Sequence, residues 1–98
     1  MTDRQDRHTM CRAKLDEWRT TVDGIKARAP ELDAEDRRKL DEALMRLEHH
    51  IAEGEARLSE LEDTDDGAWE SAKNHWDAAW DMVEKAFEKD SEAYMTDD

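Results

Sequence analysis

The sequence contains few of the residues that interrupt a helix. Its 98 residues include one proline and three glycines, whereas a β-sheet domain needs turn residues at short, regular intervals. The single cysteine, Cys11, excludes an internal disulfide. No uncharged run approaches the roughly 20 residues that span a membrane. The first residues also lack the apolar stretch of a signal peptide, so we expect a cytoplasmic protein.

Positive charge is scarce as well. Lys and Arg total 15 against 28 Asp and Glu, which gives a net charge of −13. Nucleic-acid phosphates and anionic membrane surfaces are bound mainly through Lys and Arg. The sequence therefore predicts no nucleic-acid ligand and disfavours a membrane surface, whereas a protein partner or a second copy of the chain fits its composition.

What the chain does have is helical periodicity. Only 37% of its residues are hydrophobic, and long amphipathic helices need only two or three apolar positions in seven to form a continuous core. Apolar residues recur at alternating steps of four and three, which is the spacing of one helix face. We expect a single all-α domain over residues 1–98. Its core should contain Leu15, Trp18, Val22, Ile25, Leu40, Leu44, Leu47, Ile51, Leu58, Leu61 and Val83.

Breaking and capping residues divide this pattern into three helices of similar length. Pro30 ends the first segment, because the residue before a proline is disfavoured in the α conformation. Asp33 is placed to cap the second segment, and Thr64, Asp65 or Asp66 to cap the third. The predicted helices are about 3–29, 33–62 and 66–94, followed by a short tail at 95–98.

These segments predict an antiparallel three-helix bundle or coiled coil. The apolar register continues across residues 62–67, so the alternative is a helical hairpin whose second helix runs on without a break. Gly54 lies on the apolar face of the second segment, where glycine costs helix stability of about 1 kcal/mol relative to alanine. We expect it to admit a bulky neighbour, such as a tryptophan from another helix, rather than to act as a hinge.

The third segment carries a wider apolar face than the other two. Aromatic residues recur along one side of it, beside an alanine at every seventh position. They are expected mainly to form core, with a surplus that two narrow helices cannot cover. That surplus would be an interaction surface, since Trp and Tyr are frequent interface anchors. The candidate surface residues are Trp69, Trp76, Trp80, Phe87 and Tyr94.

No catalytic motif is present in the sequence. The metal and phosphate signatures C-x-x-C, H-E-x-x-H, the calcium loop and the glycine-rich phosphate loop are missing. The sequence "HTMC" places His8, Met10 and Cys11 near one another, and soft donors of this kind suit copper(I) or zinc. An ordinary helix start is the favoured interpretation, so no metal, cofactor or small-molecule substrate is expected.

Two resemblances concern the whole arrangement. Trp18 in the first helix and Trp76 or Trp80 in the third resemble the pattern of a spectrin repeat, a three-helix coiled coil. The segments "KLDEW", "KLDEALMRLEHHIAEGEARLSELE" and "GAWESAKNHWDAAWDMVEKAFEK" are similar to those of small bacterial coiled-coil proteins assigned to stress responses. That resemblance implies a non-enzymatic helical protein.

The sequence therefore predicts a non-enzymatic bundle that acts through protein–protein contacts as a homo-oligomer. An amphipathic helical protein that opens onto a lipid surface is the first alternative. A soft-metal binder through His8, Met10 and Cys11 is the second.

Overall fold

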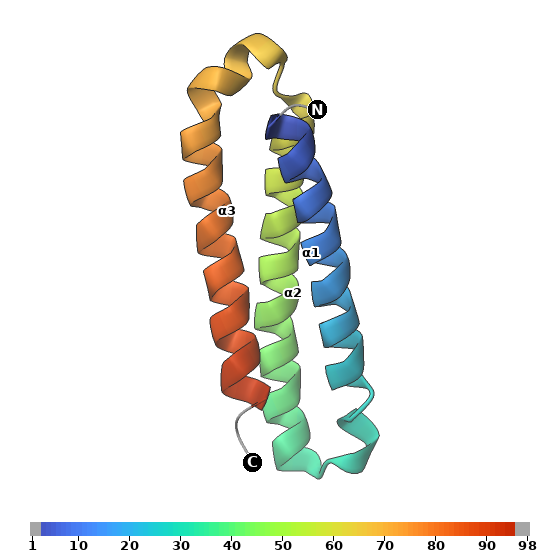
Figure 1. Ribbon diagram of the computed structural model, residues 1–98. Helices are drawn as coiled ribbons and strands as arrows, with labels where there is room; N and C mark the ends of the chain where they lie inside the picture. Colours follow the sequence, from blue (N-terminus) through green and yellow to red (C-terminus); the bar gives the residue numbers. More distant parts are fainter. Residues whose placement is uncertain (1–2, 96–98) are drawn as a thin grey trace.

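The computed structural model describes residues 3–95, and the side chains of residues 4–92. Three long helices pack side by side in an up-down-up arrangement: α1 (Asp3–Lys26), α2 (Ala34–Asp63) and α3 (Asp66–Met95) (Figure 1). The molecule measures 54 × 19 × 18 Å, about the length of one helix. The predicted three-helix bundle is confirmed, and the alternative with one continuous helix after residue 33 is wrong.

The connection between α1 and α2 begins earlier than the sequence predicts. The first helix ends at Lys26 rather than at residue 29, and a 3₁₀ turn, η1 (Ala29–Glu31), follows it. Pro30 lies inside this turn, at a position where its missing N–H breaks no helical hydrogen bond. The chain then extends at Leu32, and the Asp33 carboxylate accepts a 2.9 Å hydrogen bond from the Asp36 amide, which confirms the predicted cap.

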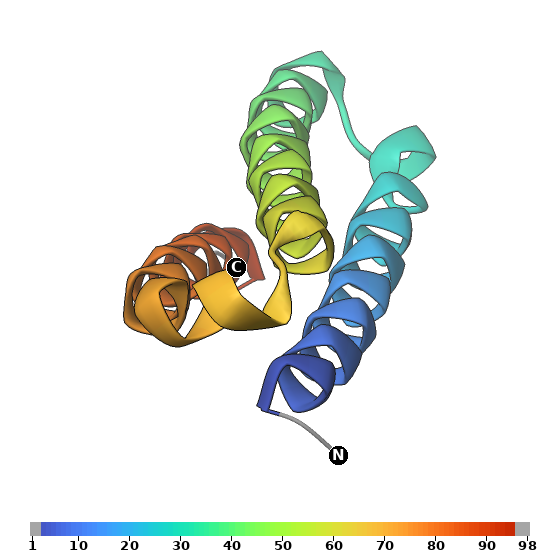
Figure 2. The same cartoon turned by 90° about the horizontal axis from the view of Figure 1, so that it is seen from above.

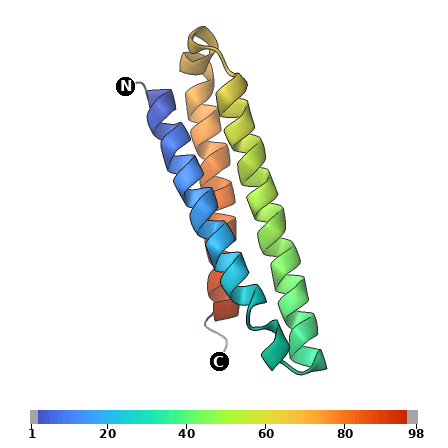
Figure 3. The ribbon, with the colours of Figure 1, turned by 90° about the vertical axis from the view of Figure 1, so that its right-hand side faces the viewer.

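A two-residue turn separates α2 from α3. The Thr64 hydroxyl donates to the Glu60 carbonyl oxygen at 2.6 Å and ends α2. Asp65 then caps α3, because its carboxylate accepts a 2.7 Å hydrogen bond from the Ala68 amide. The local capping chemistry therefore overrides the apolar register that runs through this region. The first turns of α3 lie across the end of the bundle before the helix turns along it (Figures 1 and 3).

The helix α2 is the central element of the bundle. Its backbone approaches α1 and α3 more closely than those two helices approach each other (Figure 2). Large aromatic side chains fill the space between α1 and α3, whereas small alanines lie where α3 meets α2. The core consists of Cys11, Leu15, Trp18, Val22, Ile25, Leu40, Leu44, Leu47, Ile51, Leu61, Trp69, Trp76, Trp80, Val83 and Phe87, all buried, with Leu58 partly buried beside them.

Candidate functional site

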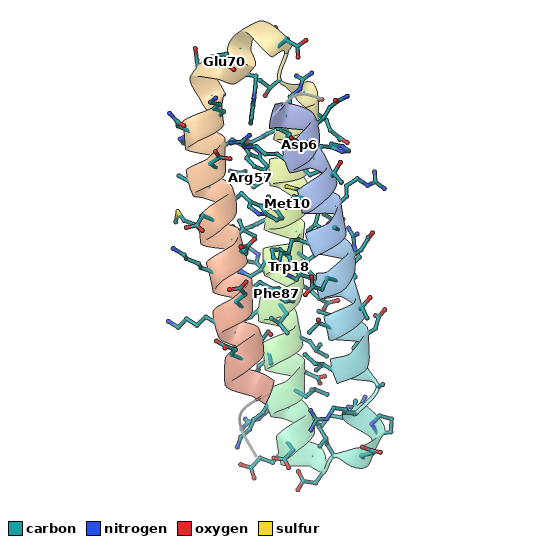
Figure 4. All side chains as sticks on the ribbon, viewed as in Figure 1. Asp6, Met10, Trp18, Arg57, Glu70 and Phe87 are labelled. Atoms are coloured by element: carbon teal, nitrogen blue, oxygen red, sulfur yellow. The ribbon has the colours of Figure 1, made fainter. Side chains whose placement is uncertain are left out.

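The aromatic residues of the bundle form one continuous column. Trp76 stacks on Trp80 with ring centroids 6.0 Å apart, and Trp69 meets Trp76 edge-on at 6.2 Å. Trp18 from α1 joins the column between Trp80, at 5.4 Å, and Phe87, at 4.5 Å. Figure 4 shows Trp18 and Phe87 at the same level of the bundle. Aromatic pairs in this geometry add about 0.5–1.5 kcal/mol each beyond their area burial.

This column corrects the predicted interaction surface. The relative exposures of Trp69, Trp76, Trp80 and Phe87 lie between 3% and 5%, so they are core residues within a single chain. The expectation of an uncovered aromatic surplus is wrong for these four residues. The reason is that Trp18 projects from α1 onto the aromatic face of α3. Its large ring covers more of that face than the narrow apolar seam of α1 was expected to cover. The side chain of Tyr94 lies outside the described residues.

Gly54 makes room for the middle of the column. A Cβ atom at this position would lie 2.8 Å from Leu15 Cδ2 and 3.3 and 3.4 Å from ring atoms of Trp80 and Trp18. The expected approach of a tryptophan from another helix is therefore confirmed. The helix α2 continues through Gly54 without interruption, and the position serves packing rather than bending.

The end of the column near the α2–α3 turn is covered by Arg7. Its guanidinium makes a two-point ion pair with Asp77, with N–O distances of 2.6 and 2.7 Å, and lies 5.3 Å from the Trp69 ring centroid. Hydrogen bonding by Arg7 lowers the pKa of Asp77, and burial opposes this shift. The Trp76 indole N–H donates to the Arg57 carbonyl at 2.7 Å, whereas the buried Trp69 N–H has no partner.

The three soft-metal candidates point in different directions. The His8 ring nitrogen lies 2.7 Å from a Glu62 carboxylate oxygen, Met10 is 41% exposed, and Cys11 is completely buried. Burial and the nearby carboxylates of Glu84 and Asp77 raise the pKa of the Cys11 thiol to about 12. Within the described residues, no three His, Cys, Asp or Glu side chains are gathered in a way that could hold a metal ion.

Ion pairs cover the seam between α1 and α2. Lys26 bonds Glu48 at 3.2 Å, and Arg19 pairs with Glu55, one heptad away on each helix. His8 and Glu62 continue this row toward the other end of the molecule. Beside these charges lie two grooves, of about 340 and 210 Å³, that reach Leu15, Val22 and Ile51. Each exposed pair contributes less than about 1 kcal/mol, but together they occupy the outer edge of this seam.

The groove between α2 and α3 has a different character. It is an open groove of about 290 Å³ and is lined by His50, Glu53, Arg57, Ala79, Met82, Val83 and Ala86. Its floor is apolar because alanines recur at seven-residue steps where α3 faces α2. Met82 stands at its edge and is 73% exposed. At one end, the His50 ring bonds Asp90 across the helices at 2.6 Å.

We regard this α2–α3 groove as the candidate functional site, which the sequence reasoning missed. The available signal was that Met82 belongs to the polar series His75, Met82 and Lys89, at seven-residue steps beside the alanines. A large apolar residue in a polar series is available for a contact outside the chain's own core. Two other large hydrophobic side chains, Met10 and Met45, are also exposed among the described residues, Met45 at 71%.

Comparison with protein-family models, curated proteins and solved structures found no match to this chain. None of the described helices is long and apolar enough to cross a membrane.

Proposed function

We propose that this chain is a non-enzymatic cytoplasmic helical bundle that acts through protein–protein contacts and associates with itself. The observation that carries the proposal is the exposure of methionine on an otherwise charged surface. Met82 and Met45 are more than two-thirds exposed, while all four tryptophans are occupied within the core. Methionine is enriched at protein interfaces because its flexible, polarisable side chain adapts to different surfaces.

The bundle is suited to this role as a stiff scaffold. The stacked column and the paired charges hold three helices in register, so the outer faces keep a fixed shape. The resemblance to bacterial coiled-coil proteins extends the proposal to a stress-related role. The lipid-surface alternative would require the helices to separate, because the apolar faces of all three are packed against one another.

Self-association is tested by sedimentation velocity and light scattering across the micromolar to millimolar range. We expect a concentration-dependent rise in mass that becomes stronger when salt is added, because a net charge of −13 per chain repels a second copy at low ionic strength. A mass equal to 11.5 kDa at every concentration and salt level would contradict the proposal.

A further inference from the structure

We propose that the α2–α3 groove is the contact between two copies of this chain, arranged about a two-fold axis, with Met82 of each copy seated in the groove of the other. This inference rests on the proposed self-association and names the surface that makes it. It uses three observations on the same face: an exposed apolar side chain, a hollow beside it, and a local balance of charge.

The first two observations make the face self-complementary. A two-fold interface brings the same patch of both copies together, so the patch must carry both a projecting group and a place to receive it. Met82 projects with 73% of its surface exposed, and the groove beside it holds about 290 Å³ over Ala79, Val83 and Ala86. An unbranched, flexible methionine side chain suits a groove of this kind.

The charges on this face favour a second copy of the chain as the binding partner. The α3-facing side of α2 carries Arg46, His50, Glu53 and Arg57, which follow one another at steps of four, three and four. Lys89 lies one heptad beyond Met82 on α3. The three cations Arg46, Arg57 and Lys89 are matched by Glu53, Glu60 and Asp90, of which Glu60 pairs with Arg57 and Asp90 with His50.

The acidic side of α3 opposes a second copy. The side of α3 that turns toward α1 carries Glu70, Asp81, Glu84 and Glu88, and residues 63–98 hold twelve Asp and Glu against three Lys. Two molecules that each carry −13 repel least where their facing charges cancel. The balanced α2–α3 face allows the apolar contact to form while the acidic faces point away from each other.

Met82→Asp tests the interface, and Met45→Asp is its matched control. Met45 is equally exposed and equally apolar, but it leaves α2 about 100° away from its neighbour Arg46, outside the groove. Dissociation constants from sedimentation equilibrium should rise tenfold or more for Met82→Asp and stay within about twofold for Met45→Asp. Because both side chains are exposed, helix content should match the wild type, and so should the thermal midpoint at concentrations where the wild type is monomeric.

A cross-linking experiment tests the symmetry itself. In Met82→Cys the two introduced thiols lie close together on either side of the axis, because Met82 borders the groove that receives its counterpart. A short bis-maleimide should therefore join two chains, whereas Met45→Cys should remain a monomer on a denaturing gel. Cys11 is present in both variants and is completely buried. If the wild type associates but the Met82 variants behave like the Met45 variants, this interface is wrong and the proposed self-association stands. A wild type that never associates overturns both.

Discussion

The indole rings of Trp18 and Trp80, one from α1 and one from α3, lie 9° from parallel with centroids 5.4 Å apart. On the α2 side of this pair lies Gly54, where a Cβ atom would come within 3.3 Å of Trp80, 3.4 Å of Trp18 and 2.8 Å of Leu15. The first and third helices thus contact each other through aromatic rings, and the missing side chain of Gly54 leaves space for these rings at the surface of the second helix. This relationship gives the first of five predictions about the stability of the folded chain.

Gly54→Ala should destabilise the protein although alanine is the better helix former. Alanine gains about 1 kcal/mol in helix propensity, but overpacking a filled core costs about 1–3 kcal/mol. We expect the free energy of unfolding to fall by roughly 1 kcal/mol in chemical denaturation. Gly24→Ala is the control: nothing lies within 4 Å of the added methyl group, so it should stabilise α1 by about 0.5–1 kcal/mol. Equal stabilisation by both changes would show that the space at Gly54 does not constrain packing.

Trp76→Phe should cost more stability than Trp69→Phe. Both changes remove part of a buried ring, but only Trp76 loses a hydrogen bond, its 2.7 Å contact with the Arg57 carbonyl. The Trp69 N–H has no partner, so phenylalanine there also removes an unsatisfied donor. The difference in free energy of unfolding should be about 1 kcal/mol. A Trp69→Phe variant that is the less stable of the two would contradict this account of the column.

Arg7 and Asp77 should be coupled, but not symmetrically. A double-mutant cycle with alanine should give a coupling energy of about 1 kcal/mol or less, because the Asp77 side chain is 41% exposed. Arg7→Ala should cost more than Asp77→Ala, since it also uncovers the Trp69 ring. Two single variants of equal stability would mean that the contact with the ring contributes nothing.

The Arg7–Asp77 ion pair also predicts that the protein loses stability in acid. Because the pKa of Asp77 is lowered in the folded state, its contribution is present above the ordinary value of 3.8 and is lost as the pH falls below that value. Asp77→Asn should flatten this part of the curve of unfolding free energy against pH. The screened position of the carboxylate keeps the change small.

Cys11 predicts a loss of stability in alkali. Its thiol has a pKa of about 12 in the folded chain against 9.0 when exposed. The unfolded chain therefore loses this proton first, and stability falls as the pH rises from 9.0 toward 12, by at most about 1.4 kcal/mol per pH unit. Cys11→Ala should show a shallower decline, and the difference between the two curves isolates this group from lysine and tyrosine. Parallel curves would refute the assignment.

Much of the fold could be predicted from residue spacing. The apolar steps of four and three gave the three helix faces, and Asp33 marked a helix start because its capping chemistry is local. The end of α1 could not be placed as well, since Ala29 keeps the apolar register although Pro30 draws the chain into a 3₁₀ turn. Local chemistry also separated α2 from α3 at Thr64 and Asp65, where periodicity alone favours continuity.

The site was harder to predict, for a geometric reason. Periodicity shows that Trp69, Trp76 and Trp80 share a face, but it does not show how far a neighbouring helix reaches across that face. Trp18 covers the column from α1, and this depends on the distance between two helices that are far apart in sequence. Met82 escaped notice because a single apolar residue in a polar series becomes significant only when the groove beside it is known.

The tryptophan column also has an optical consequence. All four tryptophans of the chain are neighbours in one row, with centroid separations of 5.4–6.2 Å, so their excited states are coupled. Circular dichroism of the folded chain should carry an exciton signal from these indoles on top of its helical spectrum. That signal depends on α1 and α3 lying together, and it would report assembly of the bundle separately from the formation of its helices.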